Sequence, residues 1–402
     1  MRTGRSSGTG GWLRRGAGLP AVRLAALAAA VAVVATVVDC GGGGSGSTGN
    51  GVGTPANLSA AQVQTIILQA ANEATARGTP ATIAVVDRVG NVLGVMQMAG
   101  APTTVTVTSA PRSVAASGLE GKSGIPSTLA AISKAITGAY LSTNGNAFTT
   151  RTASQIVQEH FDPGTTDAAG GPLFGVQFSQ LPCSDLTNNF ANNSGTLSGA
   201  PGPGPHRAPL GLSADPGGLP LYINGTLVGG IGIEANGVYG VSAFPATGFD
   251  VEGEELIAIA GQTGFTPPDS ITANRITVNG LSLRYTDSDS SELATPVRAS
   301  GTYTATSVAG YYTAGTTLAG TTFLSAASGV IADPGNNFPG VQAYMLVDNT
   351  GAVRFKPTAA TVPAGNALTA AEVQSVIVQA LGVAFDARAQ IRQPLNSFAQ
   401  VT

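Results

Sequence analysis

The chain has 402 residues, including 55 Gly and 24 Pro; 43% of its residues are hydrophobic, 10% are charged and 5% are aromatic. The apolar fraction is too high for a disordered chain, and glycine shows no three-residue period, which excludes collagen. Residues 1–39 carry five Arg and one Asp, which leaves 14 basic and 21 acidic residues beyond them. We therefore expect no basic surface for nucleic acid and no nucleic-acid partner.

The first 40 residues have the pattern of an export signal. Arginines precede a small and apolar run from Leu24 to Val38, the order found in bacterial signal peptides, and at about 15 residues the run is short for a membrane span. Cys40 and a Gly/Ser-rich segment at 41–56 follow, and such a segment predicts a flexible tether. The region resembles a lipoprotein signal. We expect lipidation at Cys40 and an exported, periplasmic or cell-surface lipoprotein held to the membrane by a lipid anchor.

One residue departs from the lipoprotein pattern. Asp39 stands where such signals usually carry Gly or Ala. Simple secretion and an uncleaved anchor therefore remain alternatives to lipidation.

Cysteine and histidine are scarce. Cys40 and Cys183 are the only cysteines, and His160 and His206 are the only histidines. Acylation of Cys40 would leave Cys183 without an intrachain partner, so we expect no disulfide framework. The remaining cysteine and two histidines are too few for an ordinary four-ligand structural zinc site, and we predict no metal site.

A sequence block near the N-terminus recurs near the C-terminus. Residues 58–70 read LSAAQVQTIILQA and residues 368–380 read LTAAEVQSVIVQA. Each copy opens with a capping box, formed by Ser59 with Gln62 and by Thr369 with Glu372, and continues with apolar residues at helical spacing. We predict a helix in each copy. We also expect residues 367–402 to begin a second domain, truncated at the C-terminus, in a native protein that continues.

The elements between the repeats follow from local signals. We predict, in order, a strand, turn and strand over 82–98, a helix over 127–142, a shorter helix over 152–161, loops over 163–219, a hairpin over 221–233 and a helix over 252–262. Asn224 and Gly225 suit the type I′ turn of the hairpin. Residues 270–366 are rich in Thr, Ser and Ala and contain Val347–Val353, which echoes Val86–Val92.

Six blocks in this order resemble the GlcG/HbpS-like haem-binding family. They are Leu58–Ala70, Ile83–Val92, Lys134–Ala135, Gly217–Pro220, Asn224–Gly232 and Glu252–Ala260. The resemblance implies an α+β fold with a profilin-like antiparallel sheet of about five strands flanked by helices. It also implies dimers or larger oligomers, and because of the tandem copy we expect either a homo-oligomer or an intrachain pseudo-dimer.

The resemblance, together with composition, gives a domain organisation. We expect an export signal at 1–40, a tether at 41–56, a GlcG/HbpS-like domain at 57–266 with a loop insertion at about 163–219, a β-rich linking region at 267–366, and the start of a second GlcG/HbpS-like domain at 367–402.

The family resemblance implies haem as the cofactor and haem capture, storage or sensing as the function. Two alternatives stay open. One is an enzyme on the same fold that degrades haem or acts on a small hydroxy acid, and the other is a non-catalytic surface binding or adhesion protein, which the Thr/Ser-rich region suggests. Two histidines without a motif such as G-x-S-x-G provide no convincing Ser/His/Asp set, so we predict no catalytic residue.

Haem iron needs an axial donor such as His, Cys, Met or Tyr. His160 is the preferred candidate, because it follows Ile156 by one helical turn and borders an apolar stripe; the alternative is a histidine that simply ends a helix. His206 lies in a Pro/Gly-rich loop, where we expect a solvated side chain.

Other donor types fit structural roles better. We interpret Met96 and Met98 as core residues of a strand, with soft iron ligands as the alternative. For Tyr222 and Cys183 as well, a structural role stands against the alternative of an iron ligand. Burial decides whether Cys183 is a reactive thiol.

Two further motifs favour structural roles. Glu254 and Glu255 stand at a predicted helix start, and we expect a solvated face there rather than acid/base work. The run Gly229–Gly232 lacks G-x-G-x-x-G spacing and does not open a helix, which excludes a dinucleotide site. We expect it to let a backbone or a flat ligand approach closely.

Overall fold

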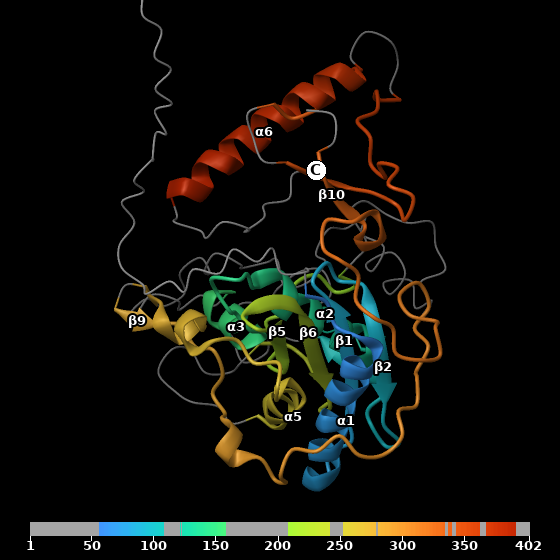
Figure 1. The fold of residues 1–402 in the computed structure, drawn as a ribbon, viewed down its shortest axis with the longest axis vertical. Coiled ribbons are helices and arrows are strands. Elements are labelled where there is room, and N and C mark those ends of the chain that lie inside the picture. Colours follow the sequence, from blue (N-terminus) through green and yellow to red (C-terminus); the bar gives the residue numbers. More distant parts are fainter. Residues whose placement is uncertain are drawn as a thin grey trace, which may run out of the picture. The chain divides into compact units, whose positions relative to one another are not determined.

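The fold is that of a computed structural model, which describes residues 56–107, 121, 123–157, 208–241, 252–278, 280–333, 337–339, 343–361 and 367–390. Helices pack on both faces of a central sheet (Figure 1). The expected α+β class is confirmed.

The central sheet has four antiparallel strands in the order β2-β1-β6-β5. Its strands are β1 (Thr82–Asp87), β2 (Val92–Gln97), β5 (Gly218–Ile223) and β6 (Thr226–Glu234). Asn224 and Gly225 join β5 to β6 with φ angles of 49° and 76°, the positive values that a type I′ turn requires. Both hairpins expected in this part of the chain are confirmed.

A separate sheet has three short strands in the spatial order β4-β3-β7, and its β3–β7 pair is parallel. The strands are β3 (Thr104–Val107), β4 (Ile125–Pro126) and β7 (Val238–Tyr239). Gly237, with a φ of 75°, turns the chain after β6, so β7 pairs with β3 instead of extending β6. The expectation of one antiparallel sheet of about five strands is therefore confirmed only in part.

Helices cover both faces of the central sheet, as Figure 1 shows. They are α1 (Ala60–Arg77) and α5 (Gly253–Gln262) on one face and α2 (Ser127–Leu141) on the other. The short helix α3 (Thr150–Val157) follows α2 and contacts β5. Alternate residues of a strand point to opposite faces; Ile83 and Val85 of β1 pack with α1 and α5, whereas Ala84 and Val86 pack with α2. The shorter helix predicted over 152–161 corresponds to α3, and residues 158–161 lie outside the described residues.

The two copies of the repeated block both begin helices. Ser59 and Gln62 form the predicted capping box of α1, and Thr369 and Glu372 exchange the same hydrogen bonds at the start of α6 (Ala370–Gln390). Eight residues of α1 are buried, but none is buried in α6 between 370 and 384. Within the described ranges, no helix is long and apolar enough to span a membrane.

The described residues between 269 and 361 form only short elements. These are the strands β8 (Thr277–Val278), β9 (Leu281–Ser282), β10 (Val330–Ala332) and β11 (Tyr344–Leu346), and the 3₁₀ turns Asp269–Ile271, Ala273–Arg275, Ser290–Glu292 and Ala326–Ser328. Part of this segment covers the edge strand β2: Thr306 N donates to Val95 O over 2.9 Å, and Leu318 N donates to Leu93 O over 2.8 Å. These contacts satisfy backbone groups that an open sheet edge would expose.

Candidate functional site

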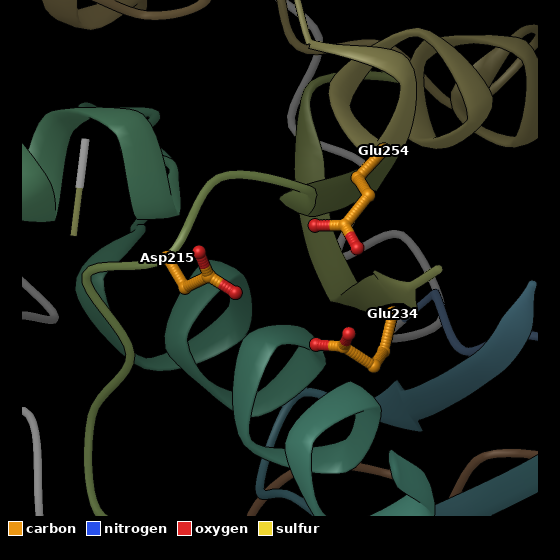
Figure 2. Close-up of side chains that lie close together, drawn as sticks. All are labelled: Asp215, Glu234 and Glu254. Carbon is orange, nitrogen blue, oxygen red and sulfur yellow. The ribbon is translucent and has the colours of Figure 1, made fainter. Parts of the chain in front are cut away.

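A lysine is buried among three carboxyl groups. Its Nζ, on Lys134 of α2, lies 2.6 Å from Asp215 Oδ2, 2.8 Å from Glu254 Oε2 and 3.2 Å from Glu234 Oε2. All four residues are buried. Figure 2 shows the three carboxyl groups, each from a different part of the chain, directed toward one another. We call these four residues the Lys134 cluster.

Two hydroxyl groups of α2 hold the segment that carries the aspartate. The backbone N–H of Leu210 donates to Ser133 Oγ over 3.0 Å, and that of Ser213 donates to Thr137 Oγ1 over 2.7 Å. Both hydroxyl groups flank the cluster lysine on the same helix. They fix the coil before β5 against α2 and thereby bring Asp215 to the lysine.

Glycines of β6 let α2 lie directly on the sheet. A Cβ atom on Gly230 would be 2.1 Å from Ala135 O, and one on Gly232 would be 2.1 Å from Ala131 O. Any larger residue would push the helix away. The steric role predicted for Gly229–Gly232 is confirmed, and the group that approaches is the backbone of α2.

The two glutamates of the cluster come from the end of β6 and the start of α5. Glu254 Oε1 accepts hydrogen bonds from the N–H groups of Ala235 (2.5 Å) and Asn236 (3.0 Å), and Glu234 Oε1 accepts one from Gly237 N over 3.1 Å. The turn after β6 is therefore tied to the first turn of α5.

The cluster holds more acidic groups than basic ones in a buried place. Burial raises the pKa of Asp215 to about 6 and raises the pKa of Glu234 well above its usual value, although Lys134 opposes both shifts. Burial lowers the pKa of Lys134, but the three acidic neighbours outweigh burial and hold it well above the usual value. Lys134, Asp215 and Glu234 therefore bind their protons more tightly in the folded protein than in an unfolded chain. The carboxyl oxygens lie within 4.8 Å of one another, a spacing suited to a cation, and the Lys134 ammonium takes that position.

A second buried ion-pair network forms around Glu255, the residue that follows Glu254 in α5. Arg151 Nε is 3.1 Å from Glu255 Oε1, and Arg151 Nη1 is 3.3 Å from Asp287 Oδ2, which also pairs with Arg284. Glu255 Oε2 accepts the backbone N–H groups of Asp287 (2.8 Å) and Ser288 (3.0 Å). Burial raises the pKa of Glu255, and Arg151 opposes that rise. This network fixes the chain after α5 to α3.

The prediction of a solvated face at Glu254 and Glu255 is wrong. The two residues are 3% and 1% exposed. Each has a buried cation from another helix as its partner, which offsets the cost of removing a carboxylate from water. Nothing in the sequence near the two glutamates shows those partners.

The preferred ligand candidates fall outside the described residues. His160, His206 and Cys183, and also the lipidation candidate Cys40, belong to segments that the structure does not describe. The assignments of His160 as a haem ligand and of Cys40 as a lipidation site therefore stay predictions.

The other donors singled out in the sequence have structural roles. Met96 and Met98 are partly buried and pack against the core beneath α1 and α5. Tyr222 is 1% exposed, and its Oη lies 2.7 Å from Thr143 O. Met96 and Met98 thus pack as predicted for core residues, and the Tyr222 hydroxyl is engaged in a hydrogen bond.

The Lys134 cluster itself was not predicted. Lys134 belongs to one of the six family-like blocks, and it is the sole charged residue of Ser127–Leu141. A lone lysine in a helix whose other residues are small, apolar or uncharged indicates a buried cation, and a buried cation requires acidic partners. This signal was available in the sequence, but it does not identify the partners.

Comparison with known proteins gives structural matches only. No family model matches the sequence, and no curated protein matches it. The structure is similar to PduOC in a complex with haem (18% identity, TM-score 0.29, covering 52% of this chain and 96% of that chain). It is also similar to the Klebsiella pneumoniae protein ORFY of family DUF336 (16% identity, TM-score 0.26, covering 51% of this chain and 88% of that chain). A third similar structure is a double mutant of Streptomyces reticuli HbpS (15% identity, TM-score 0.26, covering 56% of this chain and 97% of that chain). The chain thus has a distant structural similarity to these proteins over about half of its length.

Proposed function

We propose that this protein is an exported haem-binding protein that captures, stores or senses haem. The observation that supports the proposal is the placement of the six sequence blocks that resemble the GlcG/HbpS-like family. They fall on α1, on β1 and β2, on α2, on β5 and β6, and on α5, so the residues that carry the resemblance form one connected core. His160 is our proposed axial ligand.

A haemin titration of the full-length protein tests the haem-binding proposal. We expect a saturable one-to-one change in Soret absorbance. His160→Ala should abolish the change or alter the spin state, whereas His206→Ala, the matched control, should leave both unchanged. A folded protein that gives no saturable change would refute haem binding and would favour the small-acid enzyme or the surface-binding protein.

Export and lipidation form a separate part of the proposal. The charged and apolar order of residues 1–38, followed by Cys40 and the Gly/Ser-rich tether, supports it. Cells grown with labelled palmitate should yield labelled protein, and Cys40→Ser should lose the label, with Cys183→Ser as the control. Release of unlabelled protein into the medium would instead indicate simple secretion.

Assembly is the last part of the proposal. The repeated block and the family resemblance suggest a homo-oligomer or an intrachain pseudo-dimer. Sedimentation of the purified chain distinguishes these states, and a monomer whose mass does not change with concentration would exclude the homo-oligomer.

A further inference from the structure

The Lys134 cluster has the arrangement needed for covalent bond formation between two of its members. We propose that Lys134 Nζ and the carboxyl group of Asp215 condense to an amide, which cross-links α2 to the chain segment before β5. This inference does not depend on haem binding.

The first support is the contact between the two reacting groups. Nζ lies 2.6 Å from Asp215 Oδ2, the shortest of its three contacts with the carboxyl groups of the cluster. Holding an amine beside a carboxyl group in this way replaces a collision between separate molecules, and well-oriented intramolecular reactions reach effective molarities on the order of 10⁵–10⁸ M.

The second support is the exclusion of water. Lys134 and Glu234 are 0% exposed, Glu254 is 3% exposed and Asp215 is 5% exposed. Condensation releases water, and a site closed to solvent both favours this release and protects the amide from hydrolysis. Burial also favours the neutral form of Asp215, and a neutral carboxyl group is the form that an amine attacks.

The third support is that the remaining two acidic groups can move the protons. Glu254 Oε2 is 2.8 Å from Nζ and, with two backbone N–H groups on its other oxygen, is placed to accept a proton from the ammonium. Glu234 lies 3.2 Å from Nζ and has a carboxyl oxygen within 4.8 Å of one of Asp215. Burial raises its pKa, so it is the group of the cluster that can supply a proton to the leaving hydroxyl. Each glutamate lies within reach of the nitrogen whose protons must be moved.

The reaction balances without an added reagent. The ammonium first gives one proton to Glu254, which is the costly step because the acidic neighbours raise the pKa of Lys134. The neutral amine then forms a bond to Cγ of Asp215. The bond from Cγ to one carboxyl oxygen then breaks. The hydroxyl leaves as water with a proton from Glu234, which regains a proton from the nitrogen. One amide and one water are formed, both glutamates end protonated, and nothing is oxidised or reduced.

Peptide mapping of the purified full-length protein tests the proposal. Trypsin cannot cleave after an acylated lysine, so we expect one branched species that joins residues 123–151 to residues 208–275. Its mass should equal the sum of the two peptides less one water. Recovery of 123–134 and 135–151 as separate peptides from folded protein would overturn the proposal. Fragment sequencing that places the branch at Glu234 or Glu254 would overturn the assignment to Asp215.

Variants separate the chemistry from simple packing. Lys134→Arg keeps a cation in the cluster, but the guanidinium stays protonated and is not a nucleophile. Asp215→Ala removes the electrophile. Both variants should lose the branched species completely. Glu254→Gln should slow its appearance after refolding by about 10²-fold or more, the usual effect of removing a general base. Formation at an unchanged rate in Glu254→Gln would refute the role of Glu254. The wild-type map needs no variant to fold, so a failure to fold cannot hide the answer.

Discussion

Two glycines of β6 determine where the charged residues of the Lys134 cluster lie. Gly230 and Gly232 allow the backbone of α2 to rest on β6, and this contact brings Lys134 to the strand end that carries Glu234. A thicker layer of side chains between helix and strand would move the ammonium away from all three acidic groups. The charge cluster is thus a consequence of close helix-to-sheet packing.

Gly230→Ala is expected to destabilise the protein by about 1–3 kcal/mol or more, the usual cost of overpacking. The added Cβ would lie 2.1 Å from Ala135 O, so α2 must shift. Urea unfolding measures the loss. Gly253→Ala is the control, since a Cβ there has no neighbour within 4 Å. Equal stability of the two variants would contradict direct packing of α2 on β6.

Glu234 is expected to make the folded protein more stable at lower pH. Burial raises its pKa well above the usual 4.5, so the folded state binds the proton more tightly than the unfolded state does. The stability from this group is complete below the unfolded pKa and is lost as pH rises through the folded pKa. Denaturant unfolding over a pH series should show this decline in the wild type and a flatter profile in Glu234→Gln. The same slope in both proteins would show that Glu234 is not the group responsible.

At the scale of elements, one turn occurs twice with the same hydrogen bonds. Asp87 Oδ1 accepts from the N–H groups of Val89 (3.0 Å) and Asn91 (2.9 Å). Asp348 Oδ1 accepts from those of Thr350 (2.9 Å) and Ala352 (3.0 Å). Each turn ends with a glycine of positive φ, at 84° in the first copy and 89° in the second. Val86–Val92 and Val347–Val353 are therefore similar in structure as well as in sequence.

Elements that depend on neighbouring residues could be predicted from the sequence, and contacts between distant residues could not. Capping residues, helical spacing and Asn224–Gly225 are local signals, and they gave α1, α2, α5, α6 and both hairpins of the central sheet. The partners of Lys134 lie 81, 100 and 120 positions away in sequence, and only the folded chain shows which acidic residues meet it. The same reason explains why Glu254 and Glu255 were expected to face solvent.

Tyr303 adds side-chain hydrogen bonds to the backbone contacts that cover the edge strand β2. Tyr303 Oη lies 3.2 Å from Val95 N and 3.1 Å from Val95 O, and it also meets Tyr312 Oη at 2.8 Å. Tyr303→Phe should cost about 1 kcal/mol and should speed hydrogen exchange at the Val95 amide. Tyr140→Phe, which removes a hydroxyl bound to Val89 O at a turn, is the control. Unchanged exchange at Val95 in Tyr303→Phe would show that the segment does not protect this strand.

At the scale of the whole molecule, two helices that begin with similar sequences, within residues 58–70 and 368–380, have different surroundings. α1 packs against the central sheet and α5, whereas the described side chains of α6 are partly or fully exposed. The apolar stripe on α1 is therefore part of a core, and the same stripe on α6 contributes little burial. The sequence repeat predicts the helix in both places but does not determine what covers it.

Equivalent positions in the two helices make this difference measurable. Ile66 is 0% exposed and Val376, at the same place in the repeat, is 59% exposed. Ile66→Ala should cost about 2–5 kcal/mol because it leaves a cavity in the core. Val376→Ala should change stability by no more than about 0.5 kcal/mol, as is usual at exposed positions. Denaturant unfolding at two protein concentrations measures both effects. A loss at Val376 as large as that at Ile66 would mean that a surface covers α6 in solution, and a loss that grows with protein concentration would identify that surface as another copy of the chain.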